Sequence, residues 1–219
     1  MKGITLDDVR RWTRGDWRRP EPGMDCRPAR GICTDSRSIA RGEVFAALRG
    51  PDFDGHEFVD GAFQRGASAA IVERAWMAGG GDCRHGPLLA VDSPLAALGV
   101  VARENRKRFC LPVIAVVGSS GKTTAKEMIA AVLARRFTVL KTPASENNEI
   151  GVPKALLHLG SQHTAAVVEL AARREGDIEY LCSVARPTIG VLLNIGLAHV
   201  GIFKSVEGVA KAKGELLDY

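Results

Sequence analysis

The chain has 219 residues, a length suited to one large domain or to two small ones with a buried core. Apolar residues make up 46% and charged residues 25%, the ordinary balance of a soluble globular protein. The formal net charge is +5, but no aromatic-rich basic stripe accompanies the arginines near the start, so the composition argues against nucleic acid as a partner.

No targeting or membrane segment is indicated. The first residues lack the apolar core of a signal peptide, and the longest apolar run, Val113–Val117, is too short to span a membrane. We therefore expect a cytoplasmic protein without membrane insertion; the pattern leaves its oligomeric state open. The cysteines are odd in number and include no Cys-x-x-Cys pair, so they indicate neither a disulfide framework nor a zinc site. They are Cys26, Cys33, Cys83, Cys110 and Cys182.

The first 110 residues alternate short apolar runs with polar loops. Runs at 31–34, 44–48, 69–72 and 88–91 predict strands. Helices are predicted at 57–65 and 95–109, the second begun by Ser93-Pro94 as N-cap and first helical residue. The glycine-rich stretch 78–86 is typical of a loop.

Residues 111–219 show a clearer alternation of strands and helices. Strands are predicted at 113–117, 138–141, 165–170 and 189–195, and helices at 124–136, 153–159, 177–185 and 206–217. This repetition predicts an α/β fold with a parallel sheet. Because such a sheet usually continues after the last helix, we expect this second domain to be incomplete.

A phosphate-binding loop follows the β-branched strand 113–117. Glycines let backbone N–H groups turn toward phosphate oxygens, the lysine adds positive charge at the β- and γ-phosphates, and the first threonine is placed to ligate Mg²⁺. The pattern is a short variant of the usual loop. A plain strand-to-helix turn is the alternative, and the loop alone leaves kinases, GTPases, ATPases and ligases open. Its residues are Gly118, Ser119, Ser120, Gly121, Lys122, Thr123 and Thr124.

Further polar residues are predicted at the carboxyl ends of neighbouring strands, where open α/β sheets bind ligands. Glu169 ends one strand, Asn194 lies at the end of another, and His199 follows it. A carboxylate and an imidazole there suit a Mg²⁺ site beside the triphosphate. Asn147 and Asn148 precede a helix, so they form either an N-cap cluster or a substrate-contacting loop.

Taken together, these motifs resemble the Mur ligase family. The matching segments are 118–124, 147–153, Glu169, 194–199 and 210–215, and in the first half 34–37, 44–50 and 54–58. The resemblance implies a small N-terminal α/β uridine-nucleotide-binding domain (1–110), the first part of a P-loop ATPase domain (111–219) and no C-terminal domain. It also implies ATP and Mg²⁺ as cofactors. Within the family, segments 147–153 and 210–215 are most similar to ligases that add D-alanyl-D-alanine to UDP-N-acetylmuramoyl-tripeptide in peptidoglycan synthesis.

The resemblance assigns roles to single residues. ATP would phosphorylate the terminal carboxylate of the tripeptide, and the amine of D-alanyl-D-alanine would attack the acyl phosphate. Lys122 would stabilise the transferring phosphoryl group, Thr123 and Glu169 would ligate one Mg²⁺, and His199 would ligate a second. A carbamylated Lys213, rather than Lys211, would help to hold that second ion. Asn194 would contact the nucleotide, and substrate contacts would come from Ser36, Arg37, Asn147 and Asn148.

Two departures from the family pattern bear on these expectations. Residues 170–178 place Arg173 and Arg174 where the family has a small polar residue facing the peptide; we favour solvated arginines, with a carboxylate contact as the alternative. The chain also lacks the later parts that complete the site, so weak or absent turnover is expected. Another Mur-type ligase and a non-catalytic nucleotide-binding fragment remain the alternative functions.

Overall fold

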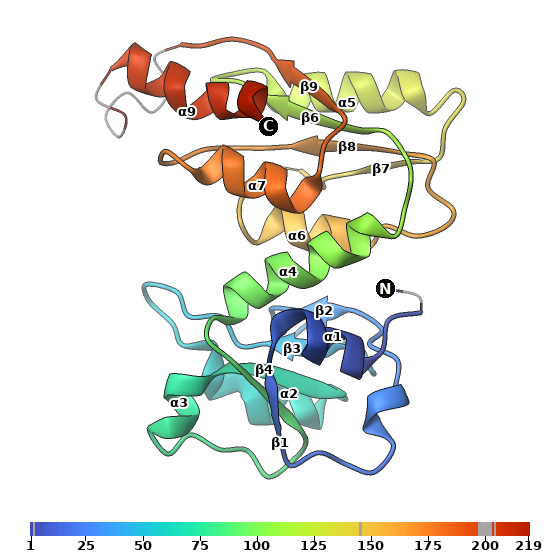
Figure 1. Ribbon diagram of the computed structural model, residues 1–219, viewed down its shortest axis with the longest axis vertical. Helices are drawn as coiled ribbons and strands as arrows, with labels where there is room; N and C mark the ends of the chain where they lie inside the picture. Colours follow the sequence, from blue (N-terminus) through green and yellow to red (C-terminus); the bar gives the residue numbers. More distant parts are fainter. Residues whose placement is uncertain (2, 145, 197–202, 204) are drawn as a thin grey trace. The chain divides into compact units, whose positions relative to one another are not determined.

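A computed structural model shows two compact units, residues 1–101 and 102–219 (Figure 1). It describes every residue except 2, 145, 197–202 and 204. The division falls within helix α4 (Pro94–Lys107), whereas the sequence suggested a boundary near residue 110. Within the described residues, no helix is long and apolar enough to cross a membrane.

The first unit contains a five-stranded sheet with the order β1-β5-β4-β3-β2. β1 runs antiparallel to β5, and the other neighbouring pairs are parallel. The strands are β1 (Asp16–Arg18), β2 (Ile32–Cys33), β3 (Val44–Ala46), β4 (Ala69–Glu73) and β5 (Leu88–Val91). The helices are α1 (Leu6–Thr13), α2 (Val59–Gln64) and α3 (Arg74–Ala78), with short 3-10 turns η1 (Met24–Cys26) and η2 (Gly55–Phe58).

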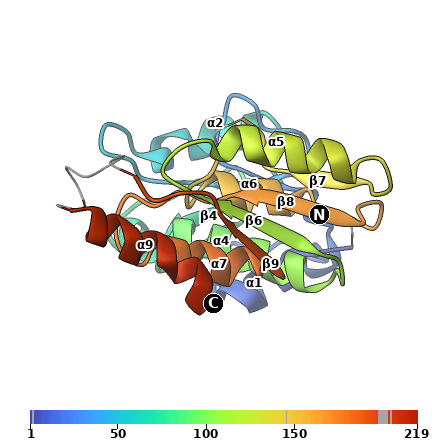
Figure 2. The ribbon, with the colours of Figure 1, turned by 90° about the horizontal axis from the view of Figure 1, so that it is seen from above.

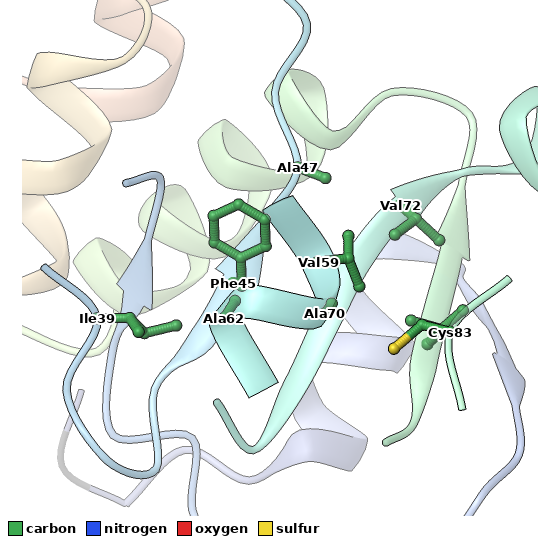
Figure 3. Packing of buried hydrophobic residues seen from close by; sticks show 9 residues of the cluster. Ile39, Phe45, Ala47, Val59, Ala62, Ala70, Val72 and Cys83 are labelled. Atoms are coloured by element: carbon green, nitrogen blue, oxygen red, sulfur yellow. The ribbon is translucent and has the colours of Figure 1, made fainter. Parts of the chain in front are cut away.

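The sheet and α2 enclose an apolar core in this unit. Figure 3 shows Phe45 of β3 and Ala70 of β4 close to Val59 and Ala62 of α2. All four are almost completely buried. Alternate residues of β3 and β4 therefore face this core, because successive strand side chains point to opposite faces of the sheet and those on one face pack against the helix.

Three elements of the first unit were absent from the sequence-based prediction: α1, β1 and α3. α1 begins with a capping box, in which Thr5 and Asp8 exchange side-chain to backbone hydrogen bonds. Arg10 and Arg11 of this helix pair with acidic residues of its own first turn, so the early arginines serve a solvated helix face. The helix predicted at 57–65 is divided into the 3-10 turn η2 and the helix α2, which starts at Val59. The Asp54 carboxylate accepts a hydrogen bond from the His56 N–H and caps η2.

The second unit has a parallel sheet with the order β7-β8-β6-β9, which confirms the predicted α/β class. Figure 2 shows α5 on one face of this sheet and α7 and α9 on the other. The strands are β6 (Val113–Val117), β7 (Val139–Lys141), β8 (Ala165–Glu169) and β9 (Ile189–Leu192). The helices, besides the end of α4, are α5 (Lys122–Leu133), α6 (Gly151–Leu157), α7 (Asp177–Ala185) and α9 (Val206–Asp218).

Several predicted boundaries in this unit were wrong for local reasons. α5 starts at Lys122 rather than 124, because Gly121 adopts a positive φ of 78° and forms the N-cap. α6 starts at Gly151 rather than at Pro153, because the Asn148 side chain accepts the hydrogen bonds of the N–H groups of residues 150 and 151. β9 ends at Leu192 rather than 195, because Asn194 turns to the phosphate loop instead of extending the ladder.

The end of α4 is fixed to the second unit by two buried polar side chains. Asn105 donates its amide to the carbonyls of Leu156 and Leu159. Burial lowers the pKa of Arg106, whose guanidinium nevertheless keeps its charge because it is surrounded by backbone carbonyls. These acceptors belong to Phe109, Leu111, Ala185 and Arg186.

In the first unit, a charged network surrounds η2. The ring Nδ1 of His56 lies 2.6 Å from the Asp54 carboxylate, and its Nε2 accepts the Glu73 backbone N–H at 3.0 Å. Since Nε2 is an acceptor, Nδ1 carries the proton and donates it to Asp54. Arg49 completes the network with an ion pair to the same carboxylate. Partial burial opposes ionisation of Asp54, but the hydrogen bonds from His56 and Arg49 outweigh it and lower the pKa to about 2.

This network gives the first unit a pH-dependent stability. A carboxylate whose pKa is lowered on folding stabilises the folded state above its unfolded value of 3.8. The contribution is lost as pH falls from 3.8 toward 2. We expect Asp54→Asn to lose about 1–2 kcal/mol of unfolding free energy at pH 7, after allowance for partial exposure, and to converge with the parent chain near pH 2. Urea unfolding at several pH values measures this, with exposed Asp52→Asn as the control; a constant difference across pH would contradict it.

Candidate active site

The phosphate loop joins the carboxyl end of β6 to the start of α5. Five buried β-branched and small residues form β6, and the chain then turns through Gly118 to Gly121. The Lys122 ammonium folds back over this turn and donates to the Gly118 carbonyl at 2.9 Å. Thr124 is exposed on the first turn of α5. The free N–H groups and positive end of α5, together with Lys122, create a concentration of positive potential suited to an anion.

Asn194 shapes this loop from the neighbouring strand. Its side-chain oxygen accepts the N–H groups of Ser119 and Ser120 at 3.2 and 3.1 Å, and its amide donates to the Ser120 carbonyl. The Ser119 hydroxyl also accepts the Gly196 N–H at 2.9 Å. The structure thus brings Asn194 to the predicted place, and its contacts there are with the loop backbone.

Glu169 is the centre of the site. It ends β8, is only 2% exposed, and both carboxylate oxygens have partners. One oxygen accepts the Thr123 hydroxyl at 2.9 Å, and the other accepts the Asn147 amide at 2.7 Å. The Glu169 backbone N–H donates to the Thr142 hydroxyl at 3.0 Å. These bonds join the first turn of α5, the end of β8 and the loop before α6 at one point.

Lys126 and Thr142 support this arrangement, and the sequence assigned a role to neither. Lys126 is completely buried one turn after Lys122, and its ammonium donates to the carbonyls of Thr142 and Ala144 at 2.8 and 2.7 Å. Lys126 therefore fixes the backbone of the segment that carries Thr142 and leads to Asn147. The sequence carried one weak signal, the spacing of four from Lys122, which places both lysines on the same helix face.

Asn147 and Asn148 have different roles in the structure. Asn147 holds Glu169, whereas Asn148 uses its side-chain oxygen to cap the start of α6. Arg174 is largely exposed and pairs with Asp177 at 3.0 Å. Arg173, also exposed, donates its backbone N–H to the same carboxylate.

Lys213 lies on α9 and is 2% exposed, although it is a lysine on a surface helix. Burial lowers the pKa of Lys213, and the nearby Lys122 charge lowers it further. In contrast, Lys211 is 72% exposed and pairs with Glu175 at 2.8 Å. The two lysines therefore differ in the structure: Lys213 is buried, whereas Lys211 is exposed and paired. His199 lies outside the described residues.

The donor set around Thr123 and Glu169 fits a hard divalent cation. Mg²⁺ prefers oxygen ligands and is usually held by one or two carboxylates together with phosphate oxygens. Here a hydroxyl and a buried carboxylate lie side by side next to the phosphate loop. Bringing Mg²⁺ to Glu169 would replace the Thr123 hydrogen bond without moving either element.

A second candidate site is a cavity of about 410 Å³ in the first unit. Residues 34–37 form its polar side; Ser36 is 8% exposed, and Arg37 pairs with Asp35 at 2.8 Å. Gly55 also lines the cavity, and a Cβ atom there would lie 2.4 Å from the Leu48 carbonyl oxygen, so only glycine fits. The apolar lining comes from Phe45, Phe53 and Phe58.

Comparison with known families identifies both units. Residues 28–145 match the model described as the Mur ligase family, catalytic domain, and residues 116–219 match the Mur ligase middle domain. A UDP-N-acetylmuramoyl-tripeptide–D-alanyl-D-alanine ligase from Synechocystis sp. is 48% identical over 186 residues, which are 85% of this chain and 40% of that protein.

Solved structures agree with these matches. The MurF crystal structure from Acinetobacter baumannii superposes with a TM-score of 0.87 at 37% identity, over 98% of this chain and 46% of that chain. The MurF ligase from Thermotoga maritima in complex with ADP gives a TM-score of 0.78 at 38% identity, over 86% of this chain and 43% of that chain. The present chain thus spans less than half the length of these relatives. It belongs to the Mur ligase family.

Proposed function

We propose that this chain provides the uridine-nucleotide-binding and ATP-binding parts of a peptidoglycan precursor ligase in the cytoplasm. That ligase would add D-alanyl-D-alanine to UDP-N-acetylmuramoyl-tripeptide with hydrolysis of ATP. The observation that carries this proposal is the buried Glu169 carboxylate, held by Thr123 and Asn147 beside the phosphate loop. The names of the relatives described above support the choice of substrates.

In this proposal, residues 1–110 bind the uridine nucleotide and residues 111–219 bind ATP. The cavity beside Ser36 and Arg37 would accept the nucleotide, with the base against the phenylalanine rings and the diphosphate near the polar segment 34–37. The polar edge offers backbone and hydroxyl donors, and the aromatic side offers a flat apolar surface. This division of chemistry suits a base joined to a charged diphosphate.

The phosphate loop would hold ATP for attack by a carboxylate. Lys122 would exchange its bond with the Gly118 carbonyl for the γ-phosphate, where developing negative charge attracts the ammonium more strongly. The γ-phosphoryl group passes to the tripeptide carboxylate, and ADP leaves. The dipeptide amine then forms the amide bond at the acyl carbon, phosphate leaves, and the amine loses a proton. The chain's contribution is to position these groups and balance their charge.

Two cation sites are proposed beside the loop. Thr123 and Glu169 would hold one Mg²⁺, and His199 and Lys213 would hold the second, the lysine as a carbamate. When bound, Mg²⁺ neutralises charge on the phosphates. Burial of Lys213, which lowers its pKa, supports this role, because it favours the neutral amine and this is the form that reacts with carbon dioxide. Asn194 would contact the nucleotide indirectly, by keeping Ser119 and Ser120 in place.

Phosphate release from ATP tests the proposed reaction. Because the chain spans less than half the length of its relatives, we expect weak release at most, and only when UDP-N-acetylmuramoyl-tripeptide and D-alanyl-D-alanine are both present. Lys122→Ala should weaken ATP binding by at least about tenfold, since it removes a charge-assisted bond, whereas Lys107→Ala, which changes an exposed side chain at the end of α4, should leave binding unchanged. ATP binding without turnover under any substrate pair would favour a nucleotide-binding module instead, and normal ATP binding by Lys122→Ala would refute the loop assignment.

Carbamylation of Lys213 has a direct spectroscopic test that does not require turnover. With ¹³C-labelled bicarbonate, the chain should give one carbamate carbon signal in NMR spectra. Lys213→Arg keeps the positive charge but removes the reactive amine, so the signal should disappear, while Lys211→Arg should retain it. A signal that persists in Lys213→Arg would contradict the assignment.

A further inference from the structure

We propose that Asp60, Cys83 and His85 form a binding site for one divalent cation of the zinc type. None of the three residues belongs to the phosphate loop or lines the cavity at residues 34–37. Asp60 lies in the first turn of α2, and the other two lie in the loop between α3 and β5. A thiol, an imidazole and a carboxylate are a ligand set that zinc and cobalt prefer, whereas Mg²⁺ prefers oxygen alone.

The three ligand atoms already converge. The Cys83 sulfur lies 2.7 Å from the Asp60 Oδ1, and the His85 Nδ1 lies 2.8 Å from the same oxygen. The sulfur and Nδ1 are 3.9 Å apart. All three fall within 4.8 Å of one another. One carboxylate oxygen therefore accepts hydrogen bonds from both other groups. A single cation bound there would displace the thiol proton, and the imidazole would carry its proton on Nε2 so that Nδ1 is free to bind the cation.

The separations are close to those of a tetrahedral site. Zinc bonds of about 2.0–2.3 Å to oxygen, nitrogen and sulfur place ligand atoms roughly 3.3–3.6 Å apart in a tetrahedral site. The sulfur–nitrogen distance of 3.9 Å is slightly longer than this range, and the oxygen must move outward by less than about 1 Å. The Asp60 and His85 side chains are 57% and 53% exposed, so both can make this adjustment. Three protein ligands leave the fourth position for water.

A cation at this site has to replace the proton of the Cys83 thiol. The backbone N–H of His85 donates to the Cys83 sulfur at 3.4 Å. Backbone donors directed at sulfur stabilise negative charge on it. Burial raises the pKa of the Cys83 thiol to about 11, and the Asp60 carboxylate contributes to this. Cation binding therefore releases the thiol proton to solvent as the sulfur–metal bond forms.

The loop that carries Cys83 and His85 is held in place without a cation. A Cβ atom at Gly81 would lie 2.3 Å from the Trp76 ring, and one at Gly86 would lie 2.3 Å from the Phe63 ring. The Arg19 guanidinium also donates to the Cys83 carbonyl at 2.7 Å. These contacts fix the loop against the unit's core, so two of the three ligands need little ordering on binding.

Titration with Co²⁺ tests the site, because cobalt bound to a thiolate shows a near-ultraviolet sulfur-to-metal charge-transfer band. The chain, purified without a histidine tag and under reducing conditions, should bind one equivalent with this band, and Zn²⁺ should displace it. Cys83→Ser should abolish the band. Asp60→Asn and His85→Asn, which change exposed side chains, should weaken Co²⁺ binding by at least about tenfold.

Two control variants identify the ligands. Cys26→Ser and His158→Asn change an exposed cysteine and an exposed histidine outside the cluster, and both should keep the band and the affinity. Thermal melting of each variant confirms that it is folded. The proposal is overturned if the parent chain shows no band, if Cys83→Ser keeps it, or if Asp60→Asn and His85→Asn both bind Co²⁺ as the parent does.

Discussion

The second unit depends on one constraint: the buried carboxylate of Glu169 needs hydrogen-bond donors or a cation as partners. An unpaired charge in an apolar interior costs several kcal/mol, so Glu169 must be satisfied by hydrogen bonds or by a cation. Thr123 and Asn147 each donate a hydrogen bond to one of its oxygens. The loop before α6, the first turn of α5 and the end of β8 are therefore positioned by one side chain. The same oxygens are the natural ligands of Mg²⁺ once phosphates arrive.

The sheet order explains why these groups meet. β6 lies between β8 and β9. The connection after β6 leads to β7 on one side, whereas the connection after β8 leads to β9 on the other side. Parallel sheets bind ligands where the connections diverge in this way, beyond the carboxyl ends of the strands. Glu169 reaches the phosphate loop from β8, and Asn194 reaches it from beyond β9. From α9, the buried Lys213 adds a second amine close enough to Lys122 for their charges to interact.

Sequence patterns predicted the parts of this site that follow from regular structure. The β-branched run 113–117 and the glycine loop predicted β6 and a helix after the loop, and the strand-end rule predicted the place of Glu169. Contacts between distant segments were not predictable: Lys126 looks like a solvated helix lysine, yet it is buried under Thr142. The cluster of Asp60, Cys83 and His85 was not predictable either, because it also joins distant segments: the spacing of cysteines does not indicate that a carboxylate from α2 lies beside one of them. Short elements such as β1 depend on pairing with β5 rather than on local pattern.

The central claim is that Glu169 links the phosphate loop to a cation. The most direct measurement is calorimetric ATP binding with Mg²⁺ and with chelator, for the parent chain, for Glu169→Gln and for the exposed control Glu175→Gln. Glutamine keeps the shape and its side-chain oxygen accepts a hydrogen bond from Thr123, but it carries no charge; its amide group donates to Asn147 once the Asn147 amide turns its oxygen toward it. We expect Mg²⁺ to tighten ATP binding in the parent and in Glu175→Gln, and we expect Glu169→Gln to lose most of this gain while its metal-free binding is unchanged. An equal Mg²⁺ effect in all three proteins would contradict it.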